Sequence, residues 1–244
     1  MKRHGSAAAA AWEIDAGYTL APKWQIALQD LTPAQSRALQ EKMKPIRLAA
    51  RSPVFRQGDV SDRLIVLDAG RIRIFQTSET GEDFTHGICV GGSTIGLTAL
   101  LLETPRTTSA ETLEVSAISV MSRNDFHGFL EAMPRFGAGL AKLLATMATE
   151  SYAQTSSFAR DTALIRLGRA LLSLARTDRQ ASPPRLEVSG LTQEDMATMI
   201  GVSRTWVALT LNMLAVQGLI VKEKRHIVIP DRSRLSRFVE RRTH

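Results

Sequence analysis

The organisation of this chain follows from one stretch, Leu191–Ile220, which reads LTQEDMATMIGVSRTWVALTLNMLAVQGLI. Thr192 can cap a helix, and Asp195, three residues later, can reach back to complete a capping box. Gly201 follows where a tight turn needs a residue that tolerates positive φ, and Ser203 can cap a second helix. Two capped helices joined by a glycine turn are typical of the helix-turn-helix unit, whose second helix enters the major groove of DNA.

The second helix of this stretch has an apolar face and an outward face. Val207, Leu211 and Leu214 recur at the spacing i, i+4, i+7, which places them together on the apolar face. The polar start of the helix therefore points away from the core. We predict DNA contacts from the two helix starts and from this outer face: Thr192, Ser203, Arg204, Thr205, Trp206, Ala208 and Leu209.

A β-hairpin is predicted directly after the second helix. Two short apolar runs, Leu219–Val221 and His226–Ile229, are joined by a basic tetrapeptide. A hairpin with a basic tip in this place is the wing of a winged helix. Its cations, which we expect to contact phosphates, are Lys222, Lys224 and Arg225. An ordinary helical hairpin, the alternative for the preceding stretch, does not account for this wing.

The excess positive charge of the chain lies in its C-terminal third. The 244 residues carry a net charge of +7 at pH 7. Residues 160–244 contain 15 Lys/Arg and 8 Asp/Glu, whereas residues 1–159 contain 16 of each. A basic unit attached to a neutral one is the charge distribution expected of a nucleic-acid reader with a separate regulatory part.

The composition excludes several other classes of protein. The single cysteine, Cys89, excludes a disulfide framework and a four-cysteine zinc or iron–sulfur site within one chain. No apolar run reaches the roughly 18 residues of a membrane span. The alanine run at 7–11 is too short and too weakly apolar for a signal-peptide core. We therefore expect a cytoplasmic protein with no membrane partner.

Short β segments dominate residues 46–120. Leu64–Leu67 and Arg71–Phe75 flank Asp68-Ala69-Gly70, which predicts a β-hairpin. Further turns and a strand are predicted at Glu79-Thr80-Gly81, Phe84–Val90 and Gly91-Gly92. Many short strands at this spacing favour a roll or sandwich over a parallel α/β sheet, and the interior of such a roll could hold a small ligand.

Helical periodicity begins at Asn124. Ser122 can cap the first helix and Pro134 interrupts it. A 3–4–3–4 spacing then runs through Leu140, Leu144, Met147, Ser151, Gln154 and Phe158. Because this seam is long enough to pair two helices and too short for an autonomous coiled coil, we predict a homodimer.

These patterns divide an α+β chain into four parts. Residues 1–45 form an N-terminal arm and a helix that starts at Thr32-Pro33, and residues 46–123 form a sensory β-roll. Residues 124–160 form the dimerisation helix region. Residues 161–244 form the winged-helix DNA-binding domain, with a last basic helix that begins at Asp231.

Over roughly residues 46–235 the chain resembles the cyclic-AMP receptor and fumarate–nitrate regulator (CRP/FNR) family of bacterial transcription factors. The resemblance is carried by roll turns at Arg56-Gln57-Gly58-Asp59 and Asp68-Ala69-Gly70-Arg71, by a cassette from Gly96 to Thr107, and by the helix-turn-helix. It implies a jelly roll like that of cyclic-nucleotide-binding proteins, a long dimerisation helix and a winged helix. It also implies an inverted repeat in double-stranded DNA as the partner, with RNA polymerase as a further candidate.

The resemblance also implies an effector site in the roll. In nucleotide-binding members the cassette begins Gly-Glu, the glutamate accepts the ribose 2′-hydroxyl, and an arginine and a hydroxyl residue hold the cyclic phosphate. Arg106 and Thr107 are present here, but Leu97 stands at the glutamate position. We therefore predict a small anionic effector other than cyclic AMP, and no iron–sulfur cluster or other assigned cofactor. The candidate effector-binding residues are Gly96, Leu97, Thr98, Arg106, Thr107, Gln154 and Thr155.

Two departures lie in the second helix of the helix-turn-helix. The family usually has Arg-Glu-Thr-Val-x-Arg there. Arg204 keeps the first arginine, but Thr205 replaces the base-reading acid and Leu209 replaces the second arginine. The resemblance therefore implies the docking mode of the family without its operator sequence.

Catalytic and metal sites are not predicted. The chain has no P-loop, G-x-S-x-G or paired-carboxylate motif, so we expect no enzyme activity. His86 and Cys89 are three residues apart on a strand and face opposite sides, so they cannot chelate together. Arg106 could equally be a structural ion-pair partner. Two alternatives stay open: a winged helix that contacts another protein instead of DNA, and, less favoured, a cupin-type enzyme.

Overall fold

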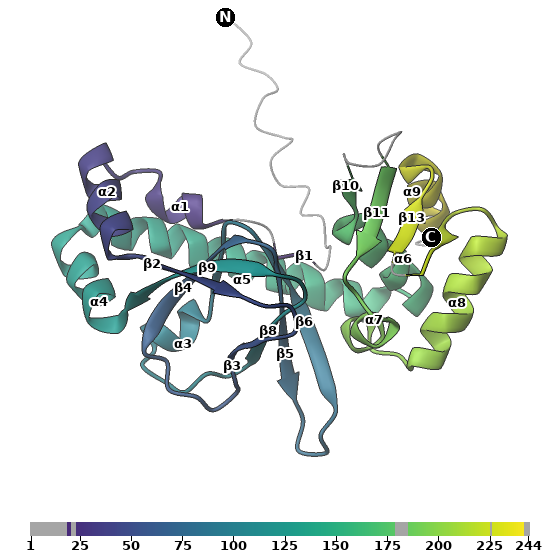
Figure 1. Ribbon diagram of the computed structural model, residues 1–244, viewed down its shortest axis with the longest axis horizontal. Helices are drawn as coiled ribbons and strands as arrows, with labels where there is room; N and C mark the ends of the chain where they lie inside the picture. The colour runs from purple at the N-terminus through teal and green to yellow at the C-terminus, as the bar shows by residue number, and fades with distance from the viewer. Residues whose placement is uncertain (1–18, 21–22, 179–184, 225, 242–244) are drawn as a thin grey trace, which may run out of the picture.

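The computed structural model describes residues 19–20, 23–178, 185–224 and 226–241 (Figure 1). The arm predicted at the N-terminus, up to residue 18, and the loop at Ser182-Pro183-Pro184 lie outside these residues. Figure 1 shows two parts, a β-roll and a C-terminal unit, connected by the long helix α5 (Pro134–Arg160) that runs along the roll.

The roll and the segments before it contain the following elements: β1 (Thr19–Leu20), α1 (Trp24–Leu28), α2 (Pro33–Lys42), β2 (Lys44–Leu48), β3 (Pro53–Phe55), β4 (Arg63–Ala69), β5 (Arg71–Thr77), β6 (Asp83–Val90), β7 (Ser93–Ile95), α3 (Leu97–Leu101), β8 (Ser109–Thr112) and β9 (Ser116–Ser122). After α4 (Arg123–Ala132) and α5, the C-terminal unit contains α6 (Ala163–Leu174), β10 (Arg176–Asp178), β11 (Arg185–Ser189), α7 (Gln193–Ile200), α8 (Arg204–Val216), β12 (Val221–Lys222), β13 (His226–Ile229) and α9 (Arg232–Glu240).

The predicted roll is present as two facing sheets. Their strand orders are β1-β6-β5-β8-β3 and β2-β9-β4-β7, and the strands pair antiparallel except for β1 with β6. Ile72 and Ile74 of β5 point into the core between the sheets, as their alternation predicts. Arg71 and Arg73 point to the other side of β5, where the C-terminal unit covers them to 1% and 8% exposure.

The hairpin predicted around Asp68-Ala69-Gly70 is wrong. β4 pairs with β7 and β9, whereas β5 pairs with β6 and β8. Gly70 has φ +97° and carries the chain from one sheet to the other, and a Cβ at this position would collide with Ser116. Turn residues show where a chain reverses, but the strands that pair are chosen by packing between distant segments.

Local signals predicted the helices before and after the roll. Thr32 and Gln35 form a capping box at the start of α2, and Ser122 caps α4. Trp24 of α1 is 6% exposed and its ring meets Phe136 of α5 edge-on at 5.9 Å between ring centroids. The segment before the roll is thus partly packed against α5.

The apolar seam of α5 packs within its own protomer. The sequence predicts instead that it pairs with the same helix of a second protomer. Leu140 is 2% exposed within a cluster that includes Leu39, Leu64 and Phe136. Leu144 and Met147 pack against the same cluster, and Phe158 packs against the C-terminal unit. The 3–4 spacing identified the buried face of α5 correctly, but the roll and α1 cover most of it.

A different stripe of α5 is exposed. It contains small residues and one aromatic at the spacing 4–3–4–3–4: Ala141, Ala145, Ala148, Tyr152, Thr155 and Ala159. Tyr152 is 74% exposed.

Within the part of the chain that the structure describes, no single helix has the length and apolarity to cross a membrane, although α7 and α8 reach that threshold as a pair bent by 105°.

Candidate nucleic-acid interface and sensory roll

The helix-turn-helix has the caps that the sequence predicts. Thr192 Oγ1 accepts from the backbone N–H of Asp195 at 3.0 Å, and the Asp195 carboxylate accepts the Thr192 N–H at 2.7 Å. Gly201 ends α7 with φ +70°, and Ser203 Oγ accepts the N–H of Trp206 at 3.2 Å. Each helix start therefore has a backbone donor satisfied by a side chain.

α8 presents most of the predicted DNA contacts on one surface. Val207, Leu211 and Leu214 are at most 1% exposed and anchor the helix to α6, α7 and the C-terminal sheet. Thr205 and Leu209 are exposed on the opposite side, Arg204 is exposed at the N-terminal end of the helix, and Trp206 and Ala208 are half-buried. Figure 1 shows α8 on the side of the C-terminal unit that is farthest from the roll. A DNA duplex can therefore approach this surface from solvent.

The wing is present and is tied to α8. β12 and β13 pair through Val221 with Val228 and Lys222 with Ile227. Lys222 Nζ donates to Asn212 Oδ1 of α8 at 2.6 Å, so that the wing cation and the outer face of α8 form one surface. Lys224 is exposed at the tip, and Arg225 lies outside the residues that the structure describes.

Two strands of the C-terminal sheet were not predicted. β11 pairs with β13 and β10, so the sheet has the order β10-β11-β13-β12. The alternation of Leu186 and Val188 is the signal that could have identified β11.

The roll cassette places its arginine inside the protein. Arg106 is 3% exposed; its Nη1 donates to the Gly96 carbonyl at 2.7 Å and its Nη2 to the Arg63 carbonyl at 2.9 Å. The guanidinium also lies over the Phe55 ring at 4.5 Å from the centroid, and burial lowers the pKa of Arg106. Arg106 is thus held by backbone carbonyls at both terminal nitrogens, while its buried Nε has no hydrogen-bond partner among the described residues.

Of the other candidate effector residues, Gly96 contacts Arg106 through its carbonyl and Thr107 follows Arg106 in the chain. Leu97 is 2% exposed in the cluster formed with Leu64, Phe126 and Phe136, outside the cluster that fills the roll. Thr98 and Thr107 are exposed. On α5, Gln154 Nε2 donates to the His86 carbonyl at 2.8 Å, and Thr155 donates to the Ser151 carbonyl at 2.9 Å.

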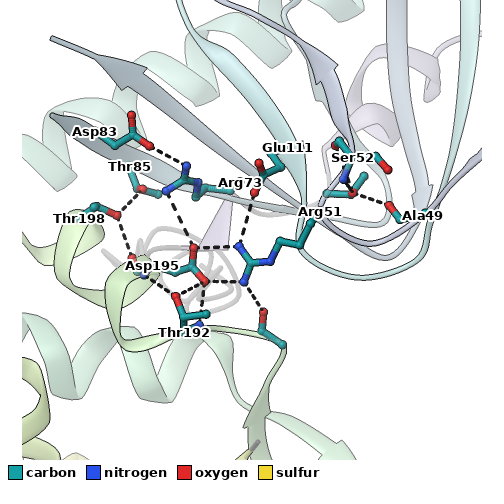
Figure 2. A network of polar contacts seen from close by, with 12 residues as sticks. Ala49, Arg51, Ser52, Arg73, Asp83, Thr85, Glu111, Thr192, Asp195 and Thr198 are labelled. Atoms are coloured by element: carbon teal, nitrogen blue, oxygen red, sulfur yellow. Dashed lines mark hydrogen bonds and ion pairs between the residues drawn. The ribbon is translucent and has the colours of Figure 1, made fainter. Parts of the chain in front are cut away.

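The roll also holds the helix-turn-helix directly (Figure 2). Arg51 Nη2 donates to Asp195 Oδ2 at 2.7 Å, and Arg51 Nη1 donates to Oδ1 at 3.1 Å. Thr85 and Thr198 are joined through their hydroxyls at 2.9 Å. Arg71 Nη2 donates to the Ser189 carbonyl at 2.5 Å, next to the start of α7.

The sequence reasoning assigned no role to Arg51, Arg73 or Thr85. The alternation along β5 showed that Arg73 leaves the core of the roll. The alternation carried no information that Arg73 would also lie 3.9 Å from Asp195 of α7, because Asp195 is more than 100 residues away in the chain.

Two family models match in series. The cyclic nucleotide-binding domain matches residues 45–133, and the Crp-like helix-turn-helix domain matches residues 165–238. Together they cover about two thirds of the chain. The chain belongs to the CRP/FNR family of transcription regulators.

Individual members of the CRP/FNR family are similar to this chain over most of its length. The "Cyclic AMP receptor protein" of Thermus thermophilus is 29% identical over 69% of this chain and 75% of its own. The "CRP-like cAMP-activated global transcriptional regulator" of Mycobacterium tuberculosis is 28% identical over 86% of this chain and 94% of its own. In fold, the c-di-GMP responsive regulator CLP of Xanthomonas campestris matches with a TM-score of 0.70 at 18% identity, covering 82% of this chain and all of that one.

One further CRP/FNR feature is altered in this chain. Thr210 of α8 occupies a position where an apolar core residue is usual in the family, and it is 8% exposed. Thr210 is therefore buried and does not belong to the exposed surface of α8.

The thiol of Cys89 is expected to be unreactive in the folded protein. It is 2% exposed between the two sheets of the roll, and burial raises its pKa to about 12, although Lys23 acts weakly in the opposite direction. The thiolate is the reactive form, so alkylation at pH 8 should be negligible until the chain unfolds. Labelling with iodoacetamide followed by mass measurement checks this; rapid labelling without denaturant would contradict the placement of Cys89.

Proposed function

We propose that the protein is a homodimeric transcription regulator that binds an inverted repeat in double-stranded DNA and responds to a small anion other than cyclic AMP. The observation that carries the DNA-binding part is the continuous surface of α8 and the wing, with Arg204 exposed and Lys222 bonded to Asn212. The net charge also supports DNA binding, since the excess of basic residues lies in the C-terminal unit that contains α8 and the wing.

Dimerisation is supported by the exposed stripe of α5. Alanines at the spacing of one or two turns allow two helices to approach closely, and Tyr152 supplies apolar area beside them. Dimerisation is also typical of the family. In a two-fold dimer the two copies of α8 would read half-sites about one helical turn, ~34 Å, apart.

Salt dependence tests DNA binding against the protein-contact alternative. Duplexes enriched from genomic fragments by the purified protein are titrated at increasing salt. If each protomer brings its three wing cations to phosphates, log K should fall with log salt with a slope of about −5, because each neutralised phosphate contributes about −0.9. Absence of duplex binding at low salt would refute the proposal and favour a winged helix that contacts protein.

Cyclic AMP is expected to be a poor effector, although both curated relatives named above carry cyclic AMP in their names. Leu97 offers no acceptor to the ribose hydroxyl, and both terminal nitrogens of Arg106 already donate to the carbonyls of Gly96 and Arg63. An unpaired buried hydroxyl costs roughly 1–3 kcal/mol, so cyclic AMP should bind about ten- to a hundred-fold more weakly than to a site with that acceptor.

Titration calorimetry with cyclic AMP measures this directly. Arg106→Lys is the matched variant, because it keeps the positive charge and removes the two-carbonyl geometry. Leu97→Glu is a poor variant, since it would bury a carboxylate in the cluster around Phe126. Micromolar cyclic AMP binding by the wild type, together with tighter binding to the DNA site, would show that the prediction is wrong.

A further inference from the structure

We propose that the roll restrains the helix-turn-helix through a polar latch, and that DNA binding is tighter when the latch opens. The latch is formed by Arg51, Arg73 and Thr85 of the roll with Asp195 and Thr198 of α7 (Figure 2). This inference rests on the proposed DNA-binding function and adds to it an internal contact that lowers affinity.

The centre of the latch is a shielded carboxylate. Asp195 is 5% exposed, and its carboxylate accepts hydrogen bonds from both terminal nitrogens of Arg51. Arg73 Nη1 lies 3.9 Å from Oδ1 of Asp195. Burial alone would raise the pKa of Asp195, but the hydrogen bonds from Arg51 and Thr192 outweigh it and hold the pKa below its ordinary value. Bidentate charge-assisted pairs of this kind are among the stronger and more directional polar contacts in proteins.

The backbone of Arg51 is strained in a way that favours this contact. Arg51 has φ +58°, in the left-handed region that residues with a side chain rarely adopt. Its turn is fixed by Thr112, whose Oγ1 donates to the Ala49 carbonyl at 2.6 Å and accepts the Ser52 N–H at 2.8 Å. Residues in sparsely populated backbone conformations cluster at ligand clamps and switch regions, and the guanidinium of Arg51 contacts Asp195 of another unit of the chain.

The roll and the C-terminal unit also share an apolar contact. Ile88 of β6 and Leu113 after β8 belong to one cluster with residues of α6, α7 and α8. α7 lies against β6, as Figure 1 shows. The position of the helix-turn-helix relative to the roll is therefore fixed by packing and by the ion pair together.

Charge explains why this position should weaken DNA binding. In a docked helix-turn-helix the first helix crosses the DNA backbone, and helix N-termini attract phosphates. In the latched structure the start of α7 lies next to Glu111 and Asp83, which are partly exposed partners of Arg51 and Arg73. The turn between β5 and β6 adds exposed Glu79 and Glu82. Phosphates approaching α7 would meet these carboxylates, which repel them.

Opening the latch by substitution provides the first test. Arg51→Asn removes the ion pair, and asparagine tolerates the left-handed backbone better than most residues. Asp195 keeps its two hydrogen bonds from Thr192, so the cap of α7 is preserved. We expect operator affinity of the full-length protein to rise about fivefold or more, within the range of typical couplings between sites.

The matched control is Arg56→Asn, which removes the same charge from an exposed site of the roll outside the latch. Loss of a cation by itself weakens DNA binding or leaves it unchanged, so tighter binding by Arg51→Asn alone cannot come from net charge. Equal or weaker binding by Arg51→Asn would overturn the proposal.

Closing the latch covalently provides the second test. The hydroxyl oxygens of Thr85 and Thr198 are 2.9 Å apart, so the double variant Thr85→Cys/Thr198→Cys brings two thiols within reach of a disulfide. Cys89 is buried and should not interfere. We expect the oxidised protein to bind the operator at least fivefold more weakly than the same protein after reduction, as for a typical coupling.

Failure of the proposed DNA-binding function can be told apart from failure of the latch. If the reduced double variant and the wild type show no salt-dependent duplex binding, the proposed function fails. If both bind the operator, and oxidation confirmed by mass leaves the affinity unchanged or increases it, the latch does not restrain DNA binding.

Discussion

Ala148→Glu in α5 should convert the dimer to a monomer and lower affinity for an inverted repeat by about 10²–10⁴-fold, the gain that linking two binding modules typically gives. Ala148 lies in the middle of the exposed stripe that contains Ala145 and Tyr152. In a symmetric pairing of two α5 helices, the two glutamates would face each other across the axis. Their repulsion and bulk would prevent the close approach that alanine permits.

Sedimentation velocity and operator titration on the same preparation measure this effect. Thr149→Glu is the control, because Thr149 is also exposed but lies about 100° around the helix from Ala148. Thr149→Glu should keep the wild-type melting temperature, since Thr149 is exposed and lies outside the stripe. A dimeric Ala148→Glu with full operator affinity would place the dimer interface elsewhere.

Arg204→Ala should lower affinity for the specific duplex by about ten- to a hundred-fold if Arg204 reads a guanine. Arg204 is the first residue of α8 and is exposed at the end of the helix that enters the groove. A bidentate contact to guanine is worth roughly 1–3 kcal/mol of discrimination, whereas a contact to phosphate weakens binding to all sequences alike.

Binding of Arg204→Ala to the specific duplex and to a random duplex separates these two roles. Arg237→Ala on α9 removes the same charge from an exposed position outside α8 and serves as the control. A selective loss on the specific duplex indicates base reading, and an equal loss on both indicates a phosphate contact. If Arg204→Ala and Arg237→Ala behave identically on both duplexes, Arg204 is not part of the recognition surface.

The helix-turn-helix could be predicted from the sequence because its signals are local. Each cap joins two residues that are three positions apart, Thr192 with Asp195 and Ser203 with Trp206. The positive φ of Gly201 is a property of that residue alone. The alternation of Ile72 and Ile74 and the placement of the wing depend on equally short periods. The excess positive charge of the C-terminal third is a property of composition and needs no structure at all.

Only the tertiary structure decided how these parts meet. Spacing identified the apolar face of α5, but several surfaces could cover that face, and the roll covers it instead of a partner helix. Arg106 could not be assigned to an anion or to the protein until its two carbonyl partners were visible.

The pairing of Arg51 with Asp195 is the clearest case, since the two residues are 144 positions apart. No local pattern relates them; each appears in the sequence as an ordinary turn or cap residue. Long-range contacts are fixed by the packing of whole elements, because only the folded chain brings distant side chains within the few ångströms over which hydrogen bonds and ion pairs act. The sequence by itself therefore determined the caps, periods and charge of this protein, and the tertiary structure decided which surfaces touch.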